Sequence, residues 1–368
     1  MLRFKQGGLA LKKAICGRCP MVVTTVEEVA EVSGLDPETS AEMVRSSGQT
    51  PGKTHVLILA GGDGTRLRAL TRSLAGDDRP KQFVAVLGRQ TLLDQTRRRA
   101  SLVVPPERTH VVLTRPHEPY YRALAAEVPP DCLVIQPENR GTAAAVLYAA
   151  LRVARQSPDA TLIFLPSDHW VSDDAAFMRE VTAAVAALEE RRLHNRVILL
   201  GIAPTRPEEQ YGWIEPIEAL VAGRSIRGVG RFIEKPPVAQ AHRFQARGYL
   251  WNSLVTVARA QAVIDLFLTV LPSWTRSFLT LSETFGTWAE QVSIARLYRE
   301  MPASDFSADV LAAAPERLAV LPVWRLLWDD LGNPARVQAI RGSLARGGPV
   351  RTLDPIRPAA GPANANLA

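Results

Sequence analysis

One segment constrains the fold and the chemistry of this chain more than any other. An apolar run at 56–60 leads directly into Gly61-Gly62-Asp63-Gly64-Thr65-Arg66-Leu67. Such a run, bounded by glycines, is typical of a buried strand. The glycines let the backbone approach a phosphate and turn its N–H groups toward it, and Arg66 adds a fixed cationic fork. The segment therefore predicts a phosphate-holding turn at the end of a strand; the alternative is a tight turn that needs glycine only for its backbone.

The spacing of these glycines differs from that of two common nucleotide-binding loops. A Walker loop has four residues between its glycines and ends in Gly-Lys-Ser/Thr, and the dinucleotide fingerprint reads Gly-x-Gly-x-x-Gly. A second phosphate contact is predicted within Arg79-Pro80-Lys81-Gln82-Phe83, because Lys81 stands behind a proline and ahead of an apolar segment that holds it in place. Taken alone, this segment would be read as carrying a surface lysine.

Short apolar runs alternate with longer amphipathic segments through the middle of the chain. They predict strands at 56–60, 110–114, 132–136, 161–166 and 197–202, and helices at 92–101, 118–127, 142–156 and 174–191. Beyond 202 the pattern predicts strands at 211–216 and 226–234 and helices that begin at Val238 and Gln261. The expected fold class is α/β, with a Rossmann-like, mostly parallel sheet covered by helices on both faces and ligands at the carboxyl ends of its strands.

The two ends of the chain differ in composition from its middle. Residues 1–53 begin with basic residues, continue through an acidic patch and end in a Gly/Ser/Pro-containing stretch, which predicts an N-terminal appendage and linker. Cys16 and Cys19 form half of a four-ligand zinc pattern that the sequence does not complete, so we interpret them as incidental thiols. Residues 342–368 are typical of a disordered tail, which leaves 54–341 as the expected folded domain.

Composition argues against several classes of protein. The 44 Lys and Arg and 37 Asp and Glu give a net charge of +7. The basic residues form no dense block and are not interleaved with aromatic residues, so no nucleic-acid partner is expected. No apolar run is long enough to cross a membrane, and the N-terminus lacks a secretory signal, so we expect no membrane partner and a cytoplasmic location. The oligomeric state is left open, with a homodimer as the assembly to test.

Together, Gly-Gly-x-Gly-Thr-Arg-Leu and the later Pro-Lys-Gln-Phe resemble the signature of the sugar-1-phosphate nucleotidyltransferases. The closest likeness is to mannose-1-phosphate guanylyltransferases, also called GDP-mannose pyrophosphorylases. Further segments resemble family motifs in the family's order: Gln136-Pro137-Glu138-Asn139-Arg140-Gly141-Thr142-Ala143, Pro166-Ser167-Asp168-His169, Tyr211-Gly212-Trp213-Ile214, Phe232-Ile233-Glu234-Lys235-Pro236 and Trp251-Asn252-Ser253. The resemblance covers residues 55 to roughly 340 and implies a nucleotide-diphospho-sugar transferase fold of the GT-A-like kind. Gly141 and Ala144 stand where the family has asparagine and proline.

The resemblance also implies a role for each matched position. The catalytic residues would be Arg66, Lys81 and Asp168. Nucleotide binding would fall to Gly61, Gly62, Gly64, Thr65, Gln136, Gly141 and Thr142. Sugar-phosphate binding would fall to Gly212, Glu234, Lys235 and Asn252, and Mg²⁺ binding to Asp168 and Asp330. Asp330 lies in Trp328-Asp329-Asp330-Leu331-Gly332, which resembles the family's late Asp-x-Gly segment; Asp329 is the alternative ligand, and the usual Gly-Ser-Trp continuation is here Gly332-Asn333-Pro334.

Residue chemistry gives an independent interpretation of several of these positions. A carboxylate at a strand's carboxyl end, as Asp168 would be, points into the ligand crevice and suits Mg²⁺, whereas Asp173 is expected to cap the next helix. We interpret His169 as structural support rather than as a base. Glu234 and Lys235 would point to opposite faces if both remained in a strand, so we expect them not to form an ion pair.

The reaction that the resemblance implies is nucleotidyl transfer. The phosphate of a hexose 1-phosphate, most readily mannose 1-phosphate, attacks the α-phosphorus of a nucleoside triphosphate, most readily GTP, and pyrophosphate is released. Alignment and charge neutralisation would supply the catalysis, with Mg²⁺ as the cofactor. The alternatives are a thymidylyl- or adenylyltransferase acting on glucose 1-phosphate, and a non-catalytic regulatory protein that binds nucleotide sugars.

Overall fold

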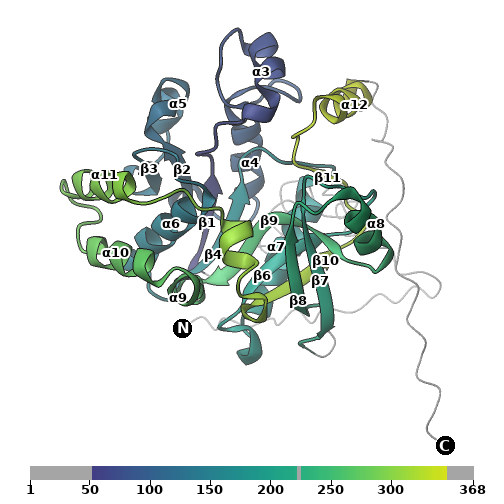
Figure 1. Ribbon diagram of the computed structural model, residues 1–368. Coiled ribbons are helices and arrows are strands. Elements are labelled where there is room, and N and C mark those ends of the chain that lie inside the picture. The colour runs from purple at the N-terminus through teal and green to yellow at the C-terminus, as the bar shows by residue number, and fades with distance from the viewer. Residues whose placement is uncertain (1–51, 222–224, 346–368) are drawn as a thin grey trace, which may run out of the picture. The chain divides into compact units, whose positions relative to one another are not determined.

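The computed structural model describes residues 52–221 and 225–345, which belong to one compact unit (Figure 1). The N-terminal appendage up to residue 51, with its cysteine pair, and the tail beyond 345 lie outside these residues. The last described helix, α12 (Pro334–Ala345), extends past the domain boundary expected at 341. No helix in the described ranges is long and apolar enough to cross a membrane.

A nine-stranded sheet forms the centre of the unit, in the order β3-β2-β1-β4-β9-β6-β10-β8-β7. Its strands are β1 (Thr54–Leu59), β2 (Thr109–Thr114), β3 (Leu133–Gln136), β4 (Thr161–Pro166), β6 (Val197–Ile202), β7 (Gly212–Ala219), β8 (Arg227–Glu234), β9 (Leu250–Arg259) and β10 (Leu318–Val323). All the strands expected from the sequence are present, close to their predicted bounds. The first four are mutually parallel, and β6 is parallel to β10.

The sheet as a whole is mixed, because its C-terminal half contains antiparallel pairs. The long strand β9 lies antiparallel between β4 and β6 and also pairs with β7. β8 is antiparallel to β7 and β10. A separate two-stranded sheet pairs β5 (Trp170–Val171) with β11 (Trp328–Asp329), which brings the segment after β4 next to the late acidic segment.

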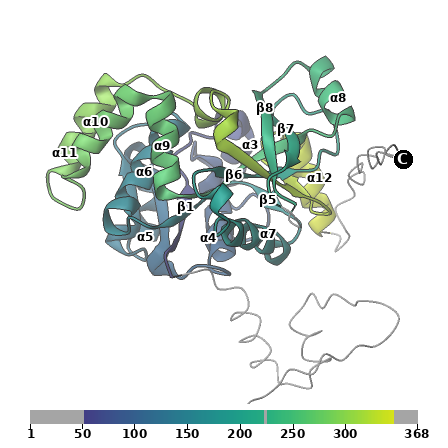
Figure 2. The same ribbon diagram turned by 90° about the horizontal axis from the view of Figure 1, so that it is seen from below.

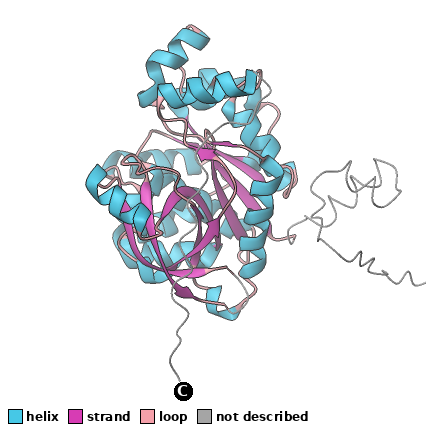
Figure 3. Cartoon of the chain, turned by 90° about the vertical axis from the view of Figure 1, so that its right-hand side faces the viewer, coloured by secondary structure: helices cyan, strands magenta, loops and turns pink. Residues whose placement is uncertain are grey.

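Helices cover both faces of the sheet, as the sequence predicted (Figures 2 and 3). On one face pack α4 (Leu92–Ala100), α5 (Glu118–Ala125) and α7 (Asp174–Ala187); on the other pack α6 (Thr142–Gln156), α9 (Ala260–Val270), α10 (Pro272–Ser282) and α11 (Glu290–Glu300). Alternate residues of β1 serve the two cores: Val56 and Ile58 enter the first, and Leu57 enters the second. Asp173 caps α7 by accepting a 2.8 Å hydrogen bond from the Ala176 N–H, as expected.

A third, smaller apolar cluster fixes the loops at the carboxyl ends of the strands. It joins residues at or after the glycine loop, the Pro-Lys-Gln-Phe segment, the Pro-Ser-Asp-His segment and the late acidic segment: Leu67, Val84, Val86, Leu92, Trp170, Leu331, Val337 and Ile340. The other α-helices of the described residues are α3 (Arg68–Ala75) after the glycine loop and α8 (Val238–Ala246) after β8. Segments far apart in the sequence therefore meet at this edge of the sheet.

Candidate active site

Two pockets adjoin at this edge. The larger, of about 370 Å³, is lined by every residue expected to bind nucleotide and by Arg66, Lys81 and Asp168. The smaller, of about 170 Å³, is lined by every residue expected to bind the sugar phosphate and by Arg66 and Asp330. Arg66 lines both pockets. Thr142, expected to bind nucleotide, also lines both pockets, so the two expected groups of residues meet at Arg66 and Thr142.

The glycine loop is held against the Pro-Lys-Gln-Phe segment. The Gln82 amide donates hydrogen bonds to the carbonyls of Ala60, at 3.0 Å, and Gly62, at 2.7 Å. Gly64 has φ +60°, and a Cβ there would lie 2.9 Å from the backbone nitrogen of Lys81. Only glycine fits this close contact without strain, so the loop has both the backbone shape and the tightness expected of a phosphate-holding turn.

Lys81 is buried, as its position in the sequence predicted. Its ammonium lies 3.2 Å from an Asp168 carboxylate oxygen and donates a 2.5 Å hydrogen bond to the main-chain carbonyl of Asp330. The side chain is only 7% exposed, whereas that of Asp168 is 24% exposed and lines the larger pocket. Lys81 therefore links the two residues that were expected to bind Mg²⁺.

Of the two neighbouring acids in the late segment, Asp330 is the one that lines the smaller pocket. Its Oδ2 accepts a 2.8 Å hydrogen bond from Arg66, and its Oδ1 accepts one of 3.0 Å from the Tyr211 hydroxyl. Burial alone would raise the pKa of Asp330, but the positive charges of Lys81 and Arg66 outweigh it and lower the pKa. Burial raises the pKa of Asp329, which instead pairs with Arg336 at 2.7 Å. Of the two, Asp330 is therefore the better candidate for the expected Mg²⁺ ligand.

His169 lies in the wall between the pockets. Its ring makes an edge-on contact with Trp328, with ring centroids 5.1 Å apart. Burial lowers the pKa of His169 to about 4. A buried, neutral ring packed against tryptophan fits the supporting role expected for it.

One expectation about the smaller pocket is wrong. Glu234 and Lys235 do form an ion pair, with Nζ and Oε1 3.1 Å apart. The reason is that Lys235 leaves the strand: its φ is +45°, so alternation between sheet faces no longer applies to it. Burial raises the pKa of Glu234. The adjacent Asn252 donates to the Ser307 hydroxyl at 3.2 Å and accepts from the Leu254 N–H at 3.0 Å.

The segment that resembles the family's base-binding motif forms one wall of the larger pocket. Gly141, where the family has asparagine, has φ +84°, and a Cβ there would lie 2.1 Å from the carbonyl oxygen of Ser304. The backbone of the 304 region therefore occupies the space beside residue 141. The Gln136 amide makes interior contacts, accepting from the Tyr298 hydroxyl at 3.2 Å and donating to the Leu113 carbonyl at 3.4 Å.

The structure adds residues that the sequence did not single out. Asn139 lines the larger pocket and bridges the loops by donating to Asp63 at 2.9 Å and accepting from the Gly141 N–H at 3.0 Å. Asp305 lines both pockets and accepts from the Thr142 hydroxyl at 3.1 Å. Asn139 belongs to a motif already quoted and could have been included, whereas no pattern in the sequence marks Asp305 or Arg336.

Comparisons with known proteins agree with this geometry. The sequence model of the family described as nucleotidyl transferase matches residues 55–337. The chain belongs to the nucleotidyl transferase family. The resemblance seen in the sequence is thereby confirmed, and the motifs that carried it lie within the matched region.

Two curated relatives place the chain more closely within the nucleotidyl transferase family. It is 33% identical over 286 residues to the xanthan biosynthesis protein XanB of Xanthomonas campestris pv. campestris, covering 75% of this chain and 57% of that protein. It is 36% identical over 217 residues to a mannose-1-phosphate guanylyltransferase of Sinorhizobium fredii, covering 56% of this chain and 39% of that protein. The matched region thus spans little more than half the length of the first relative and well under half that of the second.

A solved structure supports the fold of the nucleotidyl transferase family here. A protein of Thermus thermophilus, described as a mannose-1-phosphate geranyltransferase, matches with a TM-score of 0.67 and 33% identity, covering 78% of this chain and 79% of that one. A mannose-6-phosphate isomerase of Helicobacter pylori, with a TM-score of 0.57 and 19% identity, shares the fold. The expected α/β fold is confirmed.

Proposed function

We propose that this chain transfers a nucleotidyl group from a nucleoside triphosphate to a hexose 1-phosphate, forming a nucleotide sugar and releasing pyrophosphate. The observation that carries the proposal is the pair of adjoining pockets that share Arg66. One is built around a glycine loop and a buried lysine. The other is built around a carboxylate, an ammonium group and an amide. A triphosphate in the first and a sugar phosphate in the second would meet at Arg66.

The reaction needs charge stabilisation and alignment more than proton transfer. An oxygen of the sugar phosphate forms a bond to the α-phosphorus while the bond from that phosphorus to the bridging oxygen of pyrophosphate breaks. The amides of the glycine loop and Arg66 would hold the triphosphate. Lys81 would stabilise charge at the α-phosphate, and Lys235 would orient the attacking phosphate.

The donor set fits a Mg²⁺ ion that is shared with the substrates. Asp168 and Asp330 supply hard carboxylate oxygens, and the Lys81 ammonium joins the two residues by contacting the Asp168 carboxylate and the main-chain carbonyl of Asp330. Within residues 52–221 and 225–345, no group of three or more His, Cys, Asp and Glu side chains is placed to hold a metal ion. Mg²⁺ is commonly bound by one or two carboxylates together with substrate phosphates, so Asp168 and Asp330 would hold it in that way. There it would neutralise phosphate charge.

For the substrates, we propose GTP and mannose 1-phosphate. The name of the Sinorhizobium fredii relative supports this choice. Thymidylyl or adenylyl transfer to glucose 1-phosphate is the second candidate, because the residues proposed to hold phosphates would serve those substrates equally well. Both reactions use soluble phosphorylated compounds and fit the cytoplasmic location expected from the sequence.

The test is a matrix of substrates. The full chain is incubated with Mg²⁺ and each combination of GTP, ATP, UTP, CTP or dTTP with mannose, glucose or N-acetylglucosamine 1-phosphate, and pyrophosphate release is followed. We expect the largest kcat/KM for GTP with mannose 1-phosphate. Faster turnover with dTTP or ATP and glucose 1-phosphate would select the second candidate. Silence in every combination would reject the enzymatic function and favour a regulatory protein that binds nucleotide sugars.

A further inference from the structure

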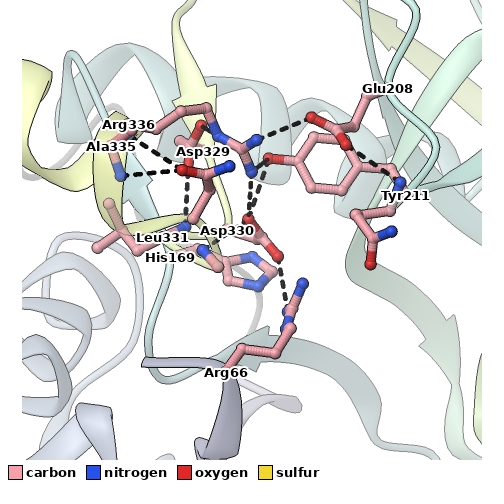
Figure 4. Close-up of polar contacts among 12 residues, drawn as sticks. Arg66, His169, Glu208, Tyr211, Asp329, Asp330, Leu331, Ala335 and Arg336 are labelled. Atoms are coloured by element: carbon pink, nitrogen blue, oxygen red, sulfur yellow. Dashed lines mark hydrogen bonds and ion pairs between the residues drawn. The ribbon is translucent and has the colours of Figure 1, made fainter. Parts of the chain in front are cut away.

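We infer that Arg336 is a positioning residue for the proposed reaction, which this inference presupposes. The geometry points to a guanidinium that holds Oδ1 of the Asp330 carboxylate, so that Oδ2 is directed toward Arg66 at the smaller pocket. Arg336 lies outside both pockets, and its effect therefore passes through Asp330. Figure 4 shows Arg336 and Arg66 on opposite sides of this carboxylate.

The Arg336 guanidinium contacts several side chains at once. Its Nη2 donates to Asp330 Oδ1 at 3.2 Å and to the Tyr211 hydroxyl at 3.0 Å. Its Nη1 donates to Glu208 at 2.9 Å, and its Nε lies 2.7 Å from an Asp329 oxygen. The planar fork of arginine suits this pattern, since a lysine ammonium presents a single point of charge.

These contacts restrain one oxygen of Asp330 and leave the other directed toward Arg66 at the smaller pocket. Oδ1 accepts from Arg336, from the Tyr211 hydroxyl at 3.0 Å and from the Gly332 N–H at 2.9 Å. Oδ2 accepts from Arg66, a side chain that is itself 50% exposed. Rotation of the carboxylate would break the contacts of Oδ1. The group is therefore held in one orientation before any substrate arrives, as charge stabilisation by a fixed carboxylate requires.

A second arginine, Arg206, helps to fix the residues that Arg336 contacts. Arg206 lies 3.1 Å from the same Glu208 carboxylate and stacks over Trp251, with 4.9 Å between its guanidinium carbon and the ring centre. The Tyr211 ring packs against Trp251 as well, with ring centroids 5.2 Å apart. Glu208 and Tyr211 are thereby fixed, and the guanidinium of Arg336 can keep one position.

Arg336 is placed by the start of α12. The Asn333 side chain accepts a 2.9 Å hydrogen bond from the Ala335 N–H, and Pro334 begins the helix. Val337 and Ile340 on the same helix pack into the third apolar cluster with Leu67. This is the point at which the sequence departs from the family's Gly-Ser-Trp. In this chain Asn333 and Pro334 form the N-terminal cap of α12, and this helix places Arg336 next to Asp330.

The test compares two substitutions of Arg336. Arg336→Met should lower kcat by roughly 10–100-fold, the usual effect of removing a residue that orients a metal ligand, while both KM values stay within about threefold. Mn²⁺ affinity, measured by electron paramagnetic resonance with α,β-methylene-GTP bound, should fall by a similar factor. Arg336→Lys keeps the charge but cannot reach Asp330, Tyr211 and Glu208 together, so both effects should be intermediate.

A matched control separates positioning from stability. Arg152 makes another buried ion pair, 2.7 Å from Glu290, that joins α6 to α11 at a distance from Asp330. Arg152→Met should lower the melting temperature and leave kcat and Mn²⁺ affinity within about threefold of wild type. Wild-type kcat and Mn²⁺ affinity in Arg336→Met would overturn the proposal. If that variant does not fold, wild-type values in Arg336→Lys would overturn it equally.

The two proposals fail in different ways. If the wild-type protein turns over no substrate pair, the proposed function is rejected. The Mn²⁺ measurement still tests Arg336, because it does not depend on turnover. An active wild-type enzyme whose Mn²⁺ affinity is the same in Arg336→Met leaves the proposed function standing and removes the inference.

Discussion

The Lys81 ammonium and the Asp168 carboxylate lie 3.2 Å apart at the base of the larger pocket. Neither group is free to act alone, because each neutralises the other in a partly buried setting. A phosphate that enters the pocket would be attracted by the lysine and repelled by the aspartate unless a cation accompanies it. Under the proposed function, this pair would couple phosphate binding to metal binding.

We expect Asp168→Asn to lower kcat by roughly 10²-fold or more, because it removes charge from the site where phosphate charge must be stabilised. The melting temperature should remain close to that of wild type, since the amide keeps the shape of the carboxylate. Initial rates of pyrophosphate release and a thermal melt check both points. Turnover near wild type would contradict the proposed role of Asp168 in holding Mg²⁺.

Lys81→Met and Asp168→Asn should not be additive. Each single variant disrupts the same ion pair, so the double variant should lose much less than the product of the two single effects. A double-mutant cycle on kcat measures this coupling. Independent effects would show that the pair is a structural contact without a shared role in turnover.

The two pockets predict separable effects on the Michaelis constants. Lys235→Met should raise KM for the hexose 1-phosphate by roughly 10-fold or more, as expected for a lost charge-assisted contact. Thr65→Ala, in the larger pocket, should raise KM for the nucleoside triphosphate by roughly 3–10-fold, as expected for a neutral hydrogen bond. In both variants the other KM should change little. A change in the same KM for both variants would contradict this division of the site.

Gly141 and Gly62 provide a matched pair for stability. Gly141→Ala combines φ +84° with a Cβ placed 2.1 Å from a main-chain oxygen, so it should destabilise the fold by roughly 1–3 kcal/mol. At Gly62 an added Cβ meets nothing within 4 Å, so Gly62→Ala should stay within about 0.5 kcal/mol of wild type. Urea unfolding gives both values. Equal losses of stability in the two variants would show that the backbone at Ser304 moves to accommodate the added methyl group at residue 141.

The fold should lose stability in mild acid. His55 and His110 are buried with ring nitrogens 3.0 Å apart, and burial lowers the pKa of each to about 4. In the unfolded chain a histidine has a pKa near 6.5, so between roughly pH 6.5 and 4 the unfolded state binds protons that the folded state does not. Stability is therefore full above about pH 6.5 and falls as the pH drops toward 4.

Urea unfolding at pH 8, 6.5 and 5 measures this decline. The double variant His55→Gln/His110→Gln should show a shallower dependence on pH than wild type, whatever its absolute stability. An identical slope in the two proteins would assign the acid sensitivity to other groups.

The sequence predicted the N-terminal half of the fold well because its signals are local. Runs such as 161–166 and 197–202 are short, apolar and bounded by polar residues, and they form β4 and β6. The strand β9 was not predicted. It ends at Arg259, and α9 begins at Ala260, so strand and helix merge into one apolar run without a turn between them.

The site was predictable where a motif carried it and not where geometry alone did. Lys81 and Asp168 could be placed because strand ends and a proline constrain them. The pairing of Lys235 with Glu234 depends on a positive φ that no rule of alternation contains. Arg336 reaches Asp330 only because α12 docks on a cluster assembled from distant segments.

The position of β9 limits how this molecule can move. Hydrogen bonds join it to β4, whose far end leads to Asp168, and to β7, which begins at Gly212 beside the smaller pocket. Both halves of the site are thus built on one shared strand. If the two halves opened and closed as hinged rigid bodies, the hydrogen bonds between β9 and its neighbouring strands would break. We therefore expect substrates to enter and products to leave through movement of the loops at the rim of the pockets.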